Sequence, residues 1–585
     1  MKQNKRRPAA RLNRFTAVTV AAALCLGLLS GCAGGGETAD TPKNTPTEEQ
    51  LTAVRDELMK QSQTEGLGDI TKLEFYEDGE RSDAAEMNIA KDNKILYYAG
   101  DIKRVVNYPD GYILDLPQDW APDFSRSPIR VRYTGEDITL TITVESVFEA
   151  SAEIQLKKWV NTYILNDSWQ DKNRVTQLSL ETRNAGEFKA QVIKLKLEDM
   201  PEGSQDHYTY VNFYSDTRME FYHFLFKSTA PVEQLDDIIA SFQRIPSKGI
   251  AVYNMDFHLS EPENWSKETA DLFSRVRNSR TYEFGIFQSN LESTGYNSTI
   301  PAFEKRTNYT FPIISQYIHF GKDGGTLPLD FYRRLNEDGR ILQLSYQFTD
   351  SNNSQLDGYS PMLDIYRGEK DKELRRLARQ IKEYGEPIFF RLNNEMSTDW
   401  TSYCASCNMA DPDIFVDTWV RLYRICEEEG ANNMIWIFNP TSESYPPGNW
   451  SHFFNYLPPA EYMQMFGLTA YVSGYEKEFP SWKDMYQKCI KANAPFFQDD
   501  EWPMCIPEYA CGQGDGTRKE EQYAWIEQAF ADTHLLPQIK YGVWFSTNDY
   551  DPDTGEPVNR FSIDIRDRKL MEAFRRGLSQ IKAGE

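Results

Sequence analysis

Residues 387–400 read PIFFRLNNEMSTDW, and their character changes abruptly. The first four residues are typical of a buried strand. The residues that follow are polar or aromatic: Arg391, Asn393, Asn394, Glu395 and Trp400. Such a strand either runs out into a solvated loop or presents a site at the end of a barrel strand. Because side chains alternate along a strand, we expect Arg391, Asn393 and Glu395 to share one face, the barrel interior.

The chain around this stretch alternates between strand and helix patterns from about residue 250 onward. Eight strand candidates occur, at residues 283–288, 311–320, 341–348, 387–396, 433–440, 462–471, 504–511 and 541–549. Eight such units predict an α/β fold, a (β/α)8 TIM barrel with insertions. The alternative is a doubly wound sheet. That fold would normally offer a Gly-rich phosphate turn after its first strand, and FGIFQSNLESTG is not one.

Two helix patterns within this region are clear. DKELRRLARQIKEYG places Leu374, Leu377, Ile381 and Tyr384 on one face and stops at Gly385. DIFVDTWVRLYRICEEEG follows the same rule and again ends at a glycine. Both helices therefore have one apolar face to pack against a barrel strand.

The region before the barrel is rich in strand patterns interrupted by two helical ones. This pattern predicts a smaller α+β domain in which helices cover an antiparallel sheet. YILDLPQDW and the closing LDDIIASFQRI resemble the PsbP-type fold. We interpret this PsbP-like domain as a structural or interaction module rather than a catalytic one. We divide the chain into four parts: a signal peptide at 1–31, a lipidated cysteine with its tether and short helix at 32–66, the α+β domain at 67–247 and the barrel at 248–585.

The first residues have the three parts of a secretory signal: a basic stretch, a short apolar stretch and a small-residue cleavage site. Ending in LLSGC, the stretch resembles the lipobox of bacterial lipoproteins, which implies cleavage before Cys32 and lipidation of its sulfur. The alternative is a plain transmembrane anchor, but the apolar run from Phe15 to Leu29 is short for a span of ~20 residues. Residues 33–47 then form a tether, and a short helix follows at 48–61. We expect an exported membrane lipoprotein that faces outward.

Composition and charge exclude some functions. At 585 residues the chain needs two or more domains. A formal charge of −24 argues against sequence-independent nucleic-acid binding, which requires a basic surface. The charge fits a protein that handles neutral or weakly charged ligands, and we expect a monomer.

Six cysteines lie beyond the signal region: Cys404, Cys407, Cys426, Cys489, Cys505 and Cys511. In an oxidising compartment an even number favours one or two disulfides, or free buried thiols. Zinc binding is the alternative, but no histidine lies nearby and the second cysteine spacing is wrong for it. The pairing is left open, and no metal is expected.

Two strand ends carry the candidate chemistry. The fourth strand ends in Glu395 and the seventh in Glu508, with Ile506 expected on the same face as Glu508. Two carboxylates surrounded by aromatic residues suit the cleavage of a glycosidic bond. A retaining hydrolase uses one as nucleophile and the other as proton donor, ~5–5.5 Å apart. Their proximity raises the pKa of one partner. Neither a metal nor a cofactor is required.

RLNNEM on the fourth strand and IPEYAC on the seventh resemble the clan A glycoside hydrolases. More specifically, residues 280–550 resemble glycoside hydrolase family 26, which contains mainly β-mannanases with some xylanases and β-glucanases. This resemblance also rests on NNMIWIFNP, YMQMFGLTAY and EEQYAWIEQAF.

The resemblance implies roles for seven residues. Glu395 would be the acid/base and Glu508 the nucleophile. Arg391 would support the carboxylate pair, and Tyr471 would hydrogen-bond the nucleophile. Asn394 would bond the sugar 2-hydroxyl. Trp400 and Trp544 would form platforms for the sugar rings. The family usually has His where this chain has Asn394. That departure leaves catalysis intact but puts mannan in doubt, because mannose and glucose differ at the 2-hydroxyl.

We therefore expect a surface-tethered retaining endo-β-glycanase that acts on mannan or a related β-linked polysaccharide. A non-catalytic glycan-binding lipoprotein is the first alternative. The second is a hydrolase that remodels the producer's own exopolysaccharide.

Overall fold

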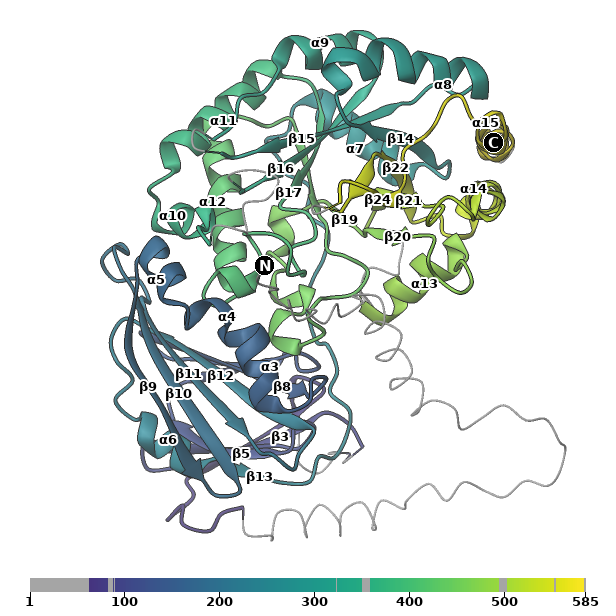
Figure 1. The fold of residues 1–585 in the computed structure, drawn as a ribbon. Coiled ribbons are helices and arrows are strands. Elements are labelled where there is room, and N and C mark those ends of the chain that lie inside the picture. Colours follow the sequence, from purple (N-terminus) through teal and green to yellow (C-terminus); the bar gives the residue numbers. More distant parts are fainter. Residues whose placement is uncertain are drawn as a thin grey trace, which may run out of the picture.

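The computed structural model describes residues 63–582, except 83–87, 89, 322–323, 350–357, 494–501 and 552–553. The expected signal, Cys32, the tether and the short helix at 48–61 lie outside the described residues. Figure 1 shows two parts, an N-terminal domain of antiparallel sheets and a C-terminal barrel. Among the described residues no helix is long and apolar enough to cross a membrane.

The N-terminal domain contains two antiparallel sheets. The first has the strand order β13-β5-β4-β3-β1-β2. Its strands are β1 (Lys72–Glu77), β2 (Glu80–Ser82), β3 (Asn93–Ala99), β4 (Ile102–Asn107), β5 (Tyr112–Pro117) and β13 (Gln243–Arg244). The second has the order β6-β7-β8-β12-β11-β10-β9. Its strands are β6 (Ala121–Asp123), β7 (Val131–Thr134), β8 (Ile138–Ser146), β9 (Val175–Ala185), β10 (Phe188–Leu197), β11 (His207–Tyr214) and β12 (Glu220–Ser228).

The inner faces of the two sheets form one core. Alternate residues of each strand point inward, so Leu96 and Leu114 of the first sheet join Val192, Val211 and Phe224 of the second in one apolar cluster. Helix α6 (Leu235–Ser241) closes an edge of this core. The expected α+β class is confirmed, but two sheets are present where one was predicted.

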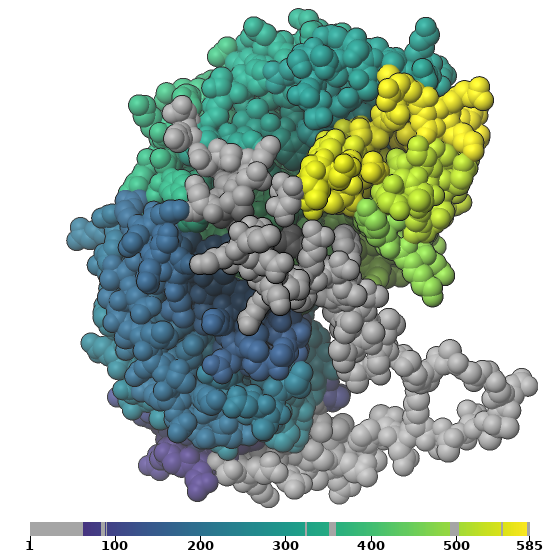
Figure 2. Space-filling view, viewed as in Figure 1, coloured from purple at the N-terminus to yellow at the C-terminus, as the bar shows by residue number. Residues whose placement is uncertain are grey.

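Short helices cover the outer face of the seven-stranded sheet and lie toward the barrel (Figure 1). They are α3 (Ala152–Gln155), a π-helical stretch (Leu156–Val160), α4 (Asn161–Ile164) and α5 (Asp167–Asn173). Trp169, Tyr208 and Tyr210 from this side belong to the same apolar cluster as the barrel residues Tyr403 and Met409. The two domains therefore share a continuous core, and Figure 2 shows them abutting.

The C-terminal half is the predicted (β/α)8 barrel. Its parallel strands are β14 (Glu283–Gln288), β15 (Ile313–His319), β16 (Ile341–Gln347), β17 (Ile388–Leu392), β18 (Met434–Phe438), β19 (Met465–Gly467) with β20 (Ala470–Val472), β21 (Met504–Cys511) and β22 (Ile539–Ser546). The sixth strand is thus split into two short pieces. The ring closes where β14 pairs with β22 and β19 pairs with β21. A short antiparallel hairpin, β23 (Asn548–Tyr550) and β24 (Pro557–Arg560), follows the last strand.

Helices surround the barrel strands. They are α8 (Ile300–Thr307), α9 (Leu329–Glu337), α10 (Pro361–Arg367), α11 (Asp371–Tyr384), α12 (Asp413–Glu429), α13 (Trp482–Asn493), α14 (Lys519–Asp532) and α15 (Arg568–Lys582). The two helix patterns read from the sequence are present. Helix α11 buries its predicted apolar face and ends at Gly385, and α12 ends at Gly430, both glycines with positive φ. Glycine is favoured there because it lacks the Cβ that crowds this conformation.

Helix α7 (Lys267–Asn278) fills the bottom of the barrel. Its Leu272, Phe273 and Val276 pack with inward-facing strand residues such as Phe389 and Val543. This cluster contains residues from β15, β17, β18, β19, β21 and β22. The barrel interior below the strand ends is therefore a packed apolar layer.

The thiols of all six cysteines are free and buried in the structure. Sγ of Cys404 lies 3.6 Å from Sγ of Cys407, at hydrogen-bonding distance. Of the two possibilities left open by the sequence, disulfides or buried thiols, the structure shows thiols.

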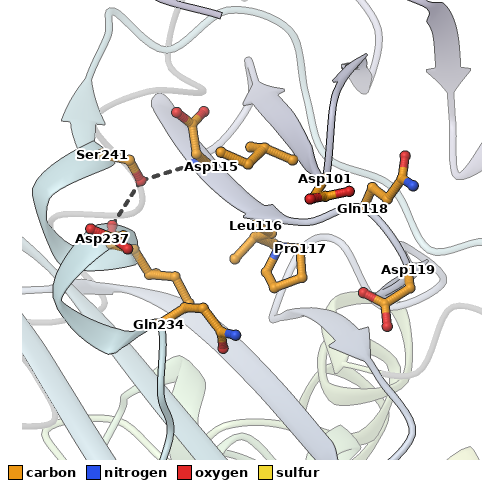
Figure 3. Close-up of a pocket in the computed structure, with 11 residues that line it drawn as sticks. Asp101, Asp115, Leu116, Pro117, Gln118, Asp119, Gln234, Asp237 and Ser241 are labelled. Carbon is orange, nitrogen blue, oxygen red and sulfur yellow. Dashed lines mark hydrogen bonds between the residues drawn. The ribbon is translucent and has the colours of Figure 1, made fainter.

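A cavity of about 430 Å³ opens on the N-terminal domain, between helix α6 on one side and the β3–β4 turn and the end of β5 on the other (Figure 3). Asp101, Asp115 and Asp119 line one side, and Asp237 and Ser241 line the other. Ser241 ties the two sides together, since its Oγ accepts from the backbone N–H of Asp115 at 3.0 Å. The cavity has no aromatic lining and lies on the domain remote from the strand-end glutamates.

The plug helix gives a stability test. We expect Phe273→Ala to lower the free energy of unfolding by about 3–5 kcal/mol, because Phe273 is fully buried and its truncation leaves a cavity. Urea unfolding followed by tryptophan fluorescence would measure the change. Asp271→Ala on the exposed face of the same helix removes only a surface ion pair and is the control, with an expected change below ~0.5 kcal/mol. Equal effects of the two substitutions would contradict the plug.

Candidate active site

Arg391 is the centre of the site. It lies near the end of β17 and is completely buried. Its Nη2 donates to Oε2 of Glu508 at 2.6 Å, and its Nη1 donates to the Tyr317 hydroxyl at 2.8 Å. Its Nε donates to the side-chain oxygen of Asn439. Nη1 also donates to the Ser345 hydroxyl at 3.1 Å. One guanidinium thereby links five barrel strands, β15, β16, β17, β18 and β21, at their carboxyl ends.

Glu508 receives two further donors. The Tyr317 hydroxyl donates to Oε2 and the Tyr471 hydroxyl donates to Oε1. Burial raises the pKa of both tyrosines well above the ordinary value, so both hydroxyls keep the protons that they donate. The carboxylate of Glu508, 7% exposed, is therefore fixed in position on both oxygens. The predicted contact between Tyr471 and Glu508 is present.

A bulge in β21 turns Glu508 into the barrel. Ile506 pairs with Gly542 and Tyr509 with Trp544, so three steps along β21 match two along β22. The extra residue falls at Pro507 and Glu508, where proline's missing N–H does no harm. The prediction that Ile506 and Glu508 share a face is wrong for this reason. Ile506 packs outward in the core shared with the helices.

Glu395 lies just beyond the end of its strand rather than in it. Strand β17 stops at Leu392, and Asn393 and Glu395 take left-handed backbone conformations with φ of 48° and 59°. The Glu395 N–H donates to the backbone oxygen of Asn439 at 2.8 Å, which fixes the turn.

The two left-handed residues break the alternation, so the expected common face is wrong for Asn393, whereas Arg391 and Glu395 both reach the site and interact electrostatically. Asn393 instead accepts from the Phe348 N–H at 2.7 Å, and its side-chain nitrogen contacts the sulfur of Met362 on α10. Its role is to hold the turn on the side away from Arg391.

The electrostatic environment of Glu395 favours its protonated form. Burial is the main cause, and the negative charge of Glu508 adds to it, so the pKa of Glu395 rises to about 8. Asp549 contributes in the same direction, whereas Arg391 and a hydrogen bond from Trp400 oppose the rise. Two carboxyl groups in one site thus have different tasks available to them: Glu395 can donate a proton near neutral pH, and Glu508 is held by three donors.

Asn394 is buried, and its side chain is fixed. Gln347 Nε2 donates to Oδ1 of Asn394 at 2.9 Å, and the hydroxyl of Tyr403 donates to its backbone oxygen at 2.7 Å. The amide therefore stands next to Glu395 in a set orientation. Its predicted bond to a sugar hydroxyl stays a prediction.

The two predicted tryptophan platforms differ. Trp400 is 44% exposed and hydrogen-bonds Glu395, so its ring is open to a ligand beside the acid. Trp544 is 1% exposed, donates its indole N–H to the backbone oxygen of Phe561 at 2.9 Å and packs against Phe574 of α15. The assignment of Trp544 as a sugar platform is wrong, because alternation along β22 turns it out toward the helices.

The next residue, Phe545, takes the inward position. It stacks on Phe287 with ring centres 5.0 Å apart and contacts the Tyr471 ring edge-on. Phe545 and Phe287 are half-buried and form an apolar floor beside Tyr317 and Tyr471.

Sequence reasoning missed three site residues. Tyr317 could have been found, because period two along β15 puts it on the same face as the interior Ile313. Phe545 follows by the same rule from the interior Tyr541 and Val543. Asn439 follows the strand and is oriented by the turn after it, which no local pattern reveals.

Among the residues that the structure describes, no group of three or more His, Cys, Asp or Glu side chains is arranged to hold a metal ion. The groups that do converge are two glutamates, an arginine, two tyrosines and open aromatic rings. Such a set performs acid–base and nucleophilic chemistry at an acetal carbon. Fold and site together define a barrel with a two-glutamate centre of the glycosidase type.

Comparison with known proteins gives the family context. Residues 353–499, which lie within the barrel, match the model of "Glycosyl hydrolase family 26". A curated relative, endoglucanase H of Acetivibrio thermocellus, is 22% identical over 255 residues, which are 43% of this chain and 26% of that protein. The chain thus spans about a quarter of the length of this relative.

Solved structures with a similar fold include two mannanases. The catalytic domain of a Bacillus sp. JAMB-750 endo-β-1,4-mannanase is 16% identical, with a TM-score of 0.44, and the similarity covers 54% of this chain and 91% of that one. A β-mannanase from a symbiotic protist of the termite Reticulitermes speratus is 12% identical, with a TM-score of 0.38, over 56% of this chain and 96% of that one.

The raised pKa of Glu395 makes a stability prediction. In the unfolded chain this carboxyl ionises near pH 4.5, so ionisation opposes folding increasingly as pH climbs from there to about 8. We expect Glu395→Gln to raise Tm at pH 8 and to change it little at pH 4.5. The free energy of unfolding at pH 8 should rise by a few kcal/mol at most, since a shift of one pKa unit corresponds to ~1.4 kcal/mol.

Differential scanning calorimetry at the two pH values would measure this difference. Glu461→Gln, at an exposed barrel position, is the control and should shift Tm equally at both. A gain for Glu395→Gln that does not depend on pH would contradict the proposed electrostatic cause.

Proposed function

We propose that this protein is a retaining glycoside hydrolase that cleaves β-linked polysaccharide, of the mannan type or a related β-glycan. One observation carries the proposal, the different environments of the two glutamates. Arg391 and two tyrosines hold Glu508. Burial and the charge of Glu508 raise the pKa of Glu395 to about 8. The matched family segment and the endoglucanase relative support the same activity.

In the first step the Glu508 carboxylate attacks the anomeric carbon of the substrate. A carbon–oxygen bond forms to Glu508 as the glycosidic carbon–oxygen bond breaks. Glu395 gives its proton to the departing oxygen, so the leaving sugar departs as a neutral alcohol. Arg391 and Tyr471 position the attacking carboxylate for in-line approach.

In the second step Glu395, now a carboxylate, removes a proton from water. The water oxygen bonds to the anomeric carbon and Glu508 leaves, which restores both side chains and returns the original anomeric configuration. The exposed ring of Trp400 and the Phe545–Phe287 floor offer apolar surfaces for the sugar rings that flank the cleaved bond.

We further propose that the enzyme is an exported lipoprotein anchored through Cys32. The support is the basic and apolar N-terminal stretch ending in LLSGC. Nutrient capture and remodelling of the producer's own exopolysaccharide both suit an anchored hydrolase.

A substrate panel tests the activity. We expect hydrolysis of at least one of β-mannan, mixed-linkage β-glucan, xylan and the native exopolysaccharide, with the β-anomer released first as followed by NMR. Release of the α-anomer first would rule out the retaining mechanism. Binding of a polysaccharide with no turnover of any member of the panel would favour the non-catalytic glycan-binding alternative.

The two glutamates give separate predictions. We expect Glu395→Ala to reduce polysaccharide hydrolysis by ~10²–10⁴-fold and Glu508→Ala to abolish it. Azide should rescue each variant differently, because it attacks the covalent intermediate in Glu395→Ala and the opposite face of the substrate in Glu508→Ala. NMR of the glycosyl azides should therefore show the β-anomer and the α-anomer respectively. Hydrolysis that persists in both variants would overturn the site.

The pH profile tests the acid. Activity should fall as pH rises through about 8, because only protonated Glu395 can donate. Asp549 helps to raise this pKa, so Asp549→Asn should move the alkaline limb of kcat/KM to lower pH. Glu556→Gln on the same hairpin is the control and should leave the limb in place. If Asp549→Asn does not move the alkaline limb, the limb reflects the ionisation of a group other than Glu395.

A further inference from the structure

The loop that carries Glu395 has an unusual backbone. It runs from Asn393, after β17, to Pro412, before α12. Of the nine non-glycine residues with positive φ in the described chain, four lie here: Asn393, Glu395, Met409 and Ala410. Residues with a Cβ take this conformation at a cost and keep it only where the surroundings hold it. The contacts that hold this loop are therefore part of the site.

The far end of the loop is held by the N-terminal domain. Tyr210, completely buried on β11, donates its hydroxyl hydrogen to the backbone oxygen of Met409, one of the left-handed residues. This is a hydrogen bond across the domain boundary to a main-chain carbonyl. It constrains the loop backbone itself rather than a side chain.

Charged side chains of the same sheet hold the next residues. Lys227 of β12 lies 3.1 Å from Oδ2 of Asp411 and 2.7 Å from Oδ2 of Asp413. Arg132 of β7 donates to both oxygens of Asp413, at 2.9 and 2.7 Å. Burial opposes the charge on Asp413, but Arg132 and Lys227 outweigh it and hold its pKa well below the ordinary value. The ion pairs of Asp413 therefore stay charged at neutral pH, whereas burial raises the pKa of the neighbouring Asp411.

The near end of the loop is also supported across the boundary. The backbone oxygen of Ser397, two residues after Glu395, accepts from the Tyr445 N–H at 2.7 Å. Trp159 of the N-terminal domain packs edge-on against the Tyr445 ring, with ring centres 5.2 Å apart. Both ends of the segment that follows the acid thus rest on the N-terminal domain.

We propose that the N-terminal domain positions the catalytic acid, with Tyr210 and Lys227 as positioning residues that act through the 393–412 loop on Glu395. Neither residue touches the reacting atoms. The proposal rests on the proposed function, because it assigns Glu395 the role of acid. It gives the N-terminal domain a part in the hydrolysis itself and not only in attachment.

The test compares three full-length variants. Tyr210→Phe removes one hydroxyl from the loop, and Lys227→Met removes the ammonium while keeping an unbranched apolar chain. Tyr222→Phe is the matched control, because Tyr222 is equally buried on the neighbouring strand. Its hydroxyl also donates to main-chain oxygens, of Asp110 and Gly111 at 3.2 and 3.3 Å, but these lie within its own domain.

The first readout is amide hydrogen exchange and needs no activity. We expect Tyr210→Phe and Lys227→Met to speed exchange of peptides covering 395–411 by about tenfold or more, since a removed contact shifts the local opening equilibrium. Tyr222→Phe should leave this loop unchanged. Equal exchange of the loop in all three variants would overturn the proposal, whether or not the protein is a hydrolase.

The second readout separates positioning from a general loss of stability. Polysaccharide needs a proton on its leaving group, whereas 2,4-dinitrophenyl β-cellobioside and β-mannobioside do not, because dinitrophenolate leaves unaided. Tyr210→Phe should lower kcat/KM on the polysaccharide by about 10- to 100-fold but should lower kcat/KM on the aryl glycosides, which reports the first step alone, less than about threefold. Azide should raise kcat of Tyr210→Phe on the aryl glycosides, because it attacks the covalent intermediate without needing Glu395 as a base.

Equal losses on both substrates would show a merely structural role for Tyr210 and overturn the proposal. Turnover of neither substrate by the wild type would refute the proposed function instead. In that case faster exchange of the 395–411 peptides in Tyr210→Phe would still establish the structural coupling between the domain and the loop.

Discussion

The site depends on one buried charge. Arg391 lies inside the barrel with no solvent exposure, and an isolated buried charge is too costly to be tolerated. Every nitrogen of its guanidinium therefore has a partner, among them Glu508, Tyr317 and Asn439. These partners come from different strands, so satisfying the one cation fixes the relative register of the strand ends. The same requirement places the carboxylate of Glu508 at the mouth of the barrel.

The second glutamate shows the opposite electrostatic situation. Glu395 is about as buried as Glu508, yet Arg391, Tyr317 and Tyr471 donate their hydrogen bonds to Glu508 and not to it. Burial and the neighbouring negative charge therefore raise its pKa. The two side chains are chemically identical, but Arg391 contacts only Glu508. This difference suits Glu395 to donate a proton and Glu508 to act as its charged partner. Because its pKa is raised, ionisation of Glu395 is expected to oppose folding as pH rises.

The two domains are joined through the same region. The N-terminal sheet directs a tyrosine hydroxyl and three cationic side chains, Lys227, Arg130 and Arg132, toward residues 409–413. Those residues end the loop that begins at Glu395. Attachment of the domain and geometry of the acid are therefore linked by one stretch of chain, which explains why so many left-handed residues are tolerated there.

Much of this could be predicted from the sequence. The strand–helix alternation after residue 250 predicted the barrel, and β14 and β21 have the predicted bounds. Local apolar patterns also predicted helices α11 and α12 with their glycine ends. The convergence of Arg391, Tyr471 and Glu508 followed from the rule that barrel strands end on one face. A second sheet in the N-terminal domain was not predicted, because strand patterns do not say how strands divide between sheets.

What the sequence determined by itself is the set of barrel strands, the identity of the two strand-end glutamates and the arginine four residues before one of them. The directions of the side chains were decided only by the tertiary structure. A bulge at Pro507 turned Glu508 inward, left-handed turns at Asn393 and Glu395 ended the alternation early, and the outward position of Trp544 left Phe545 facing the site. Local period and composition cannot contain this information, because each turn is imposed by contacts with residues far away in the chain.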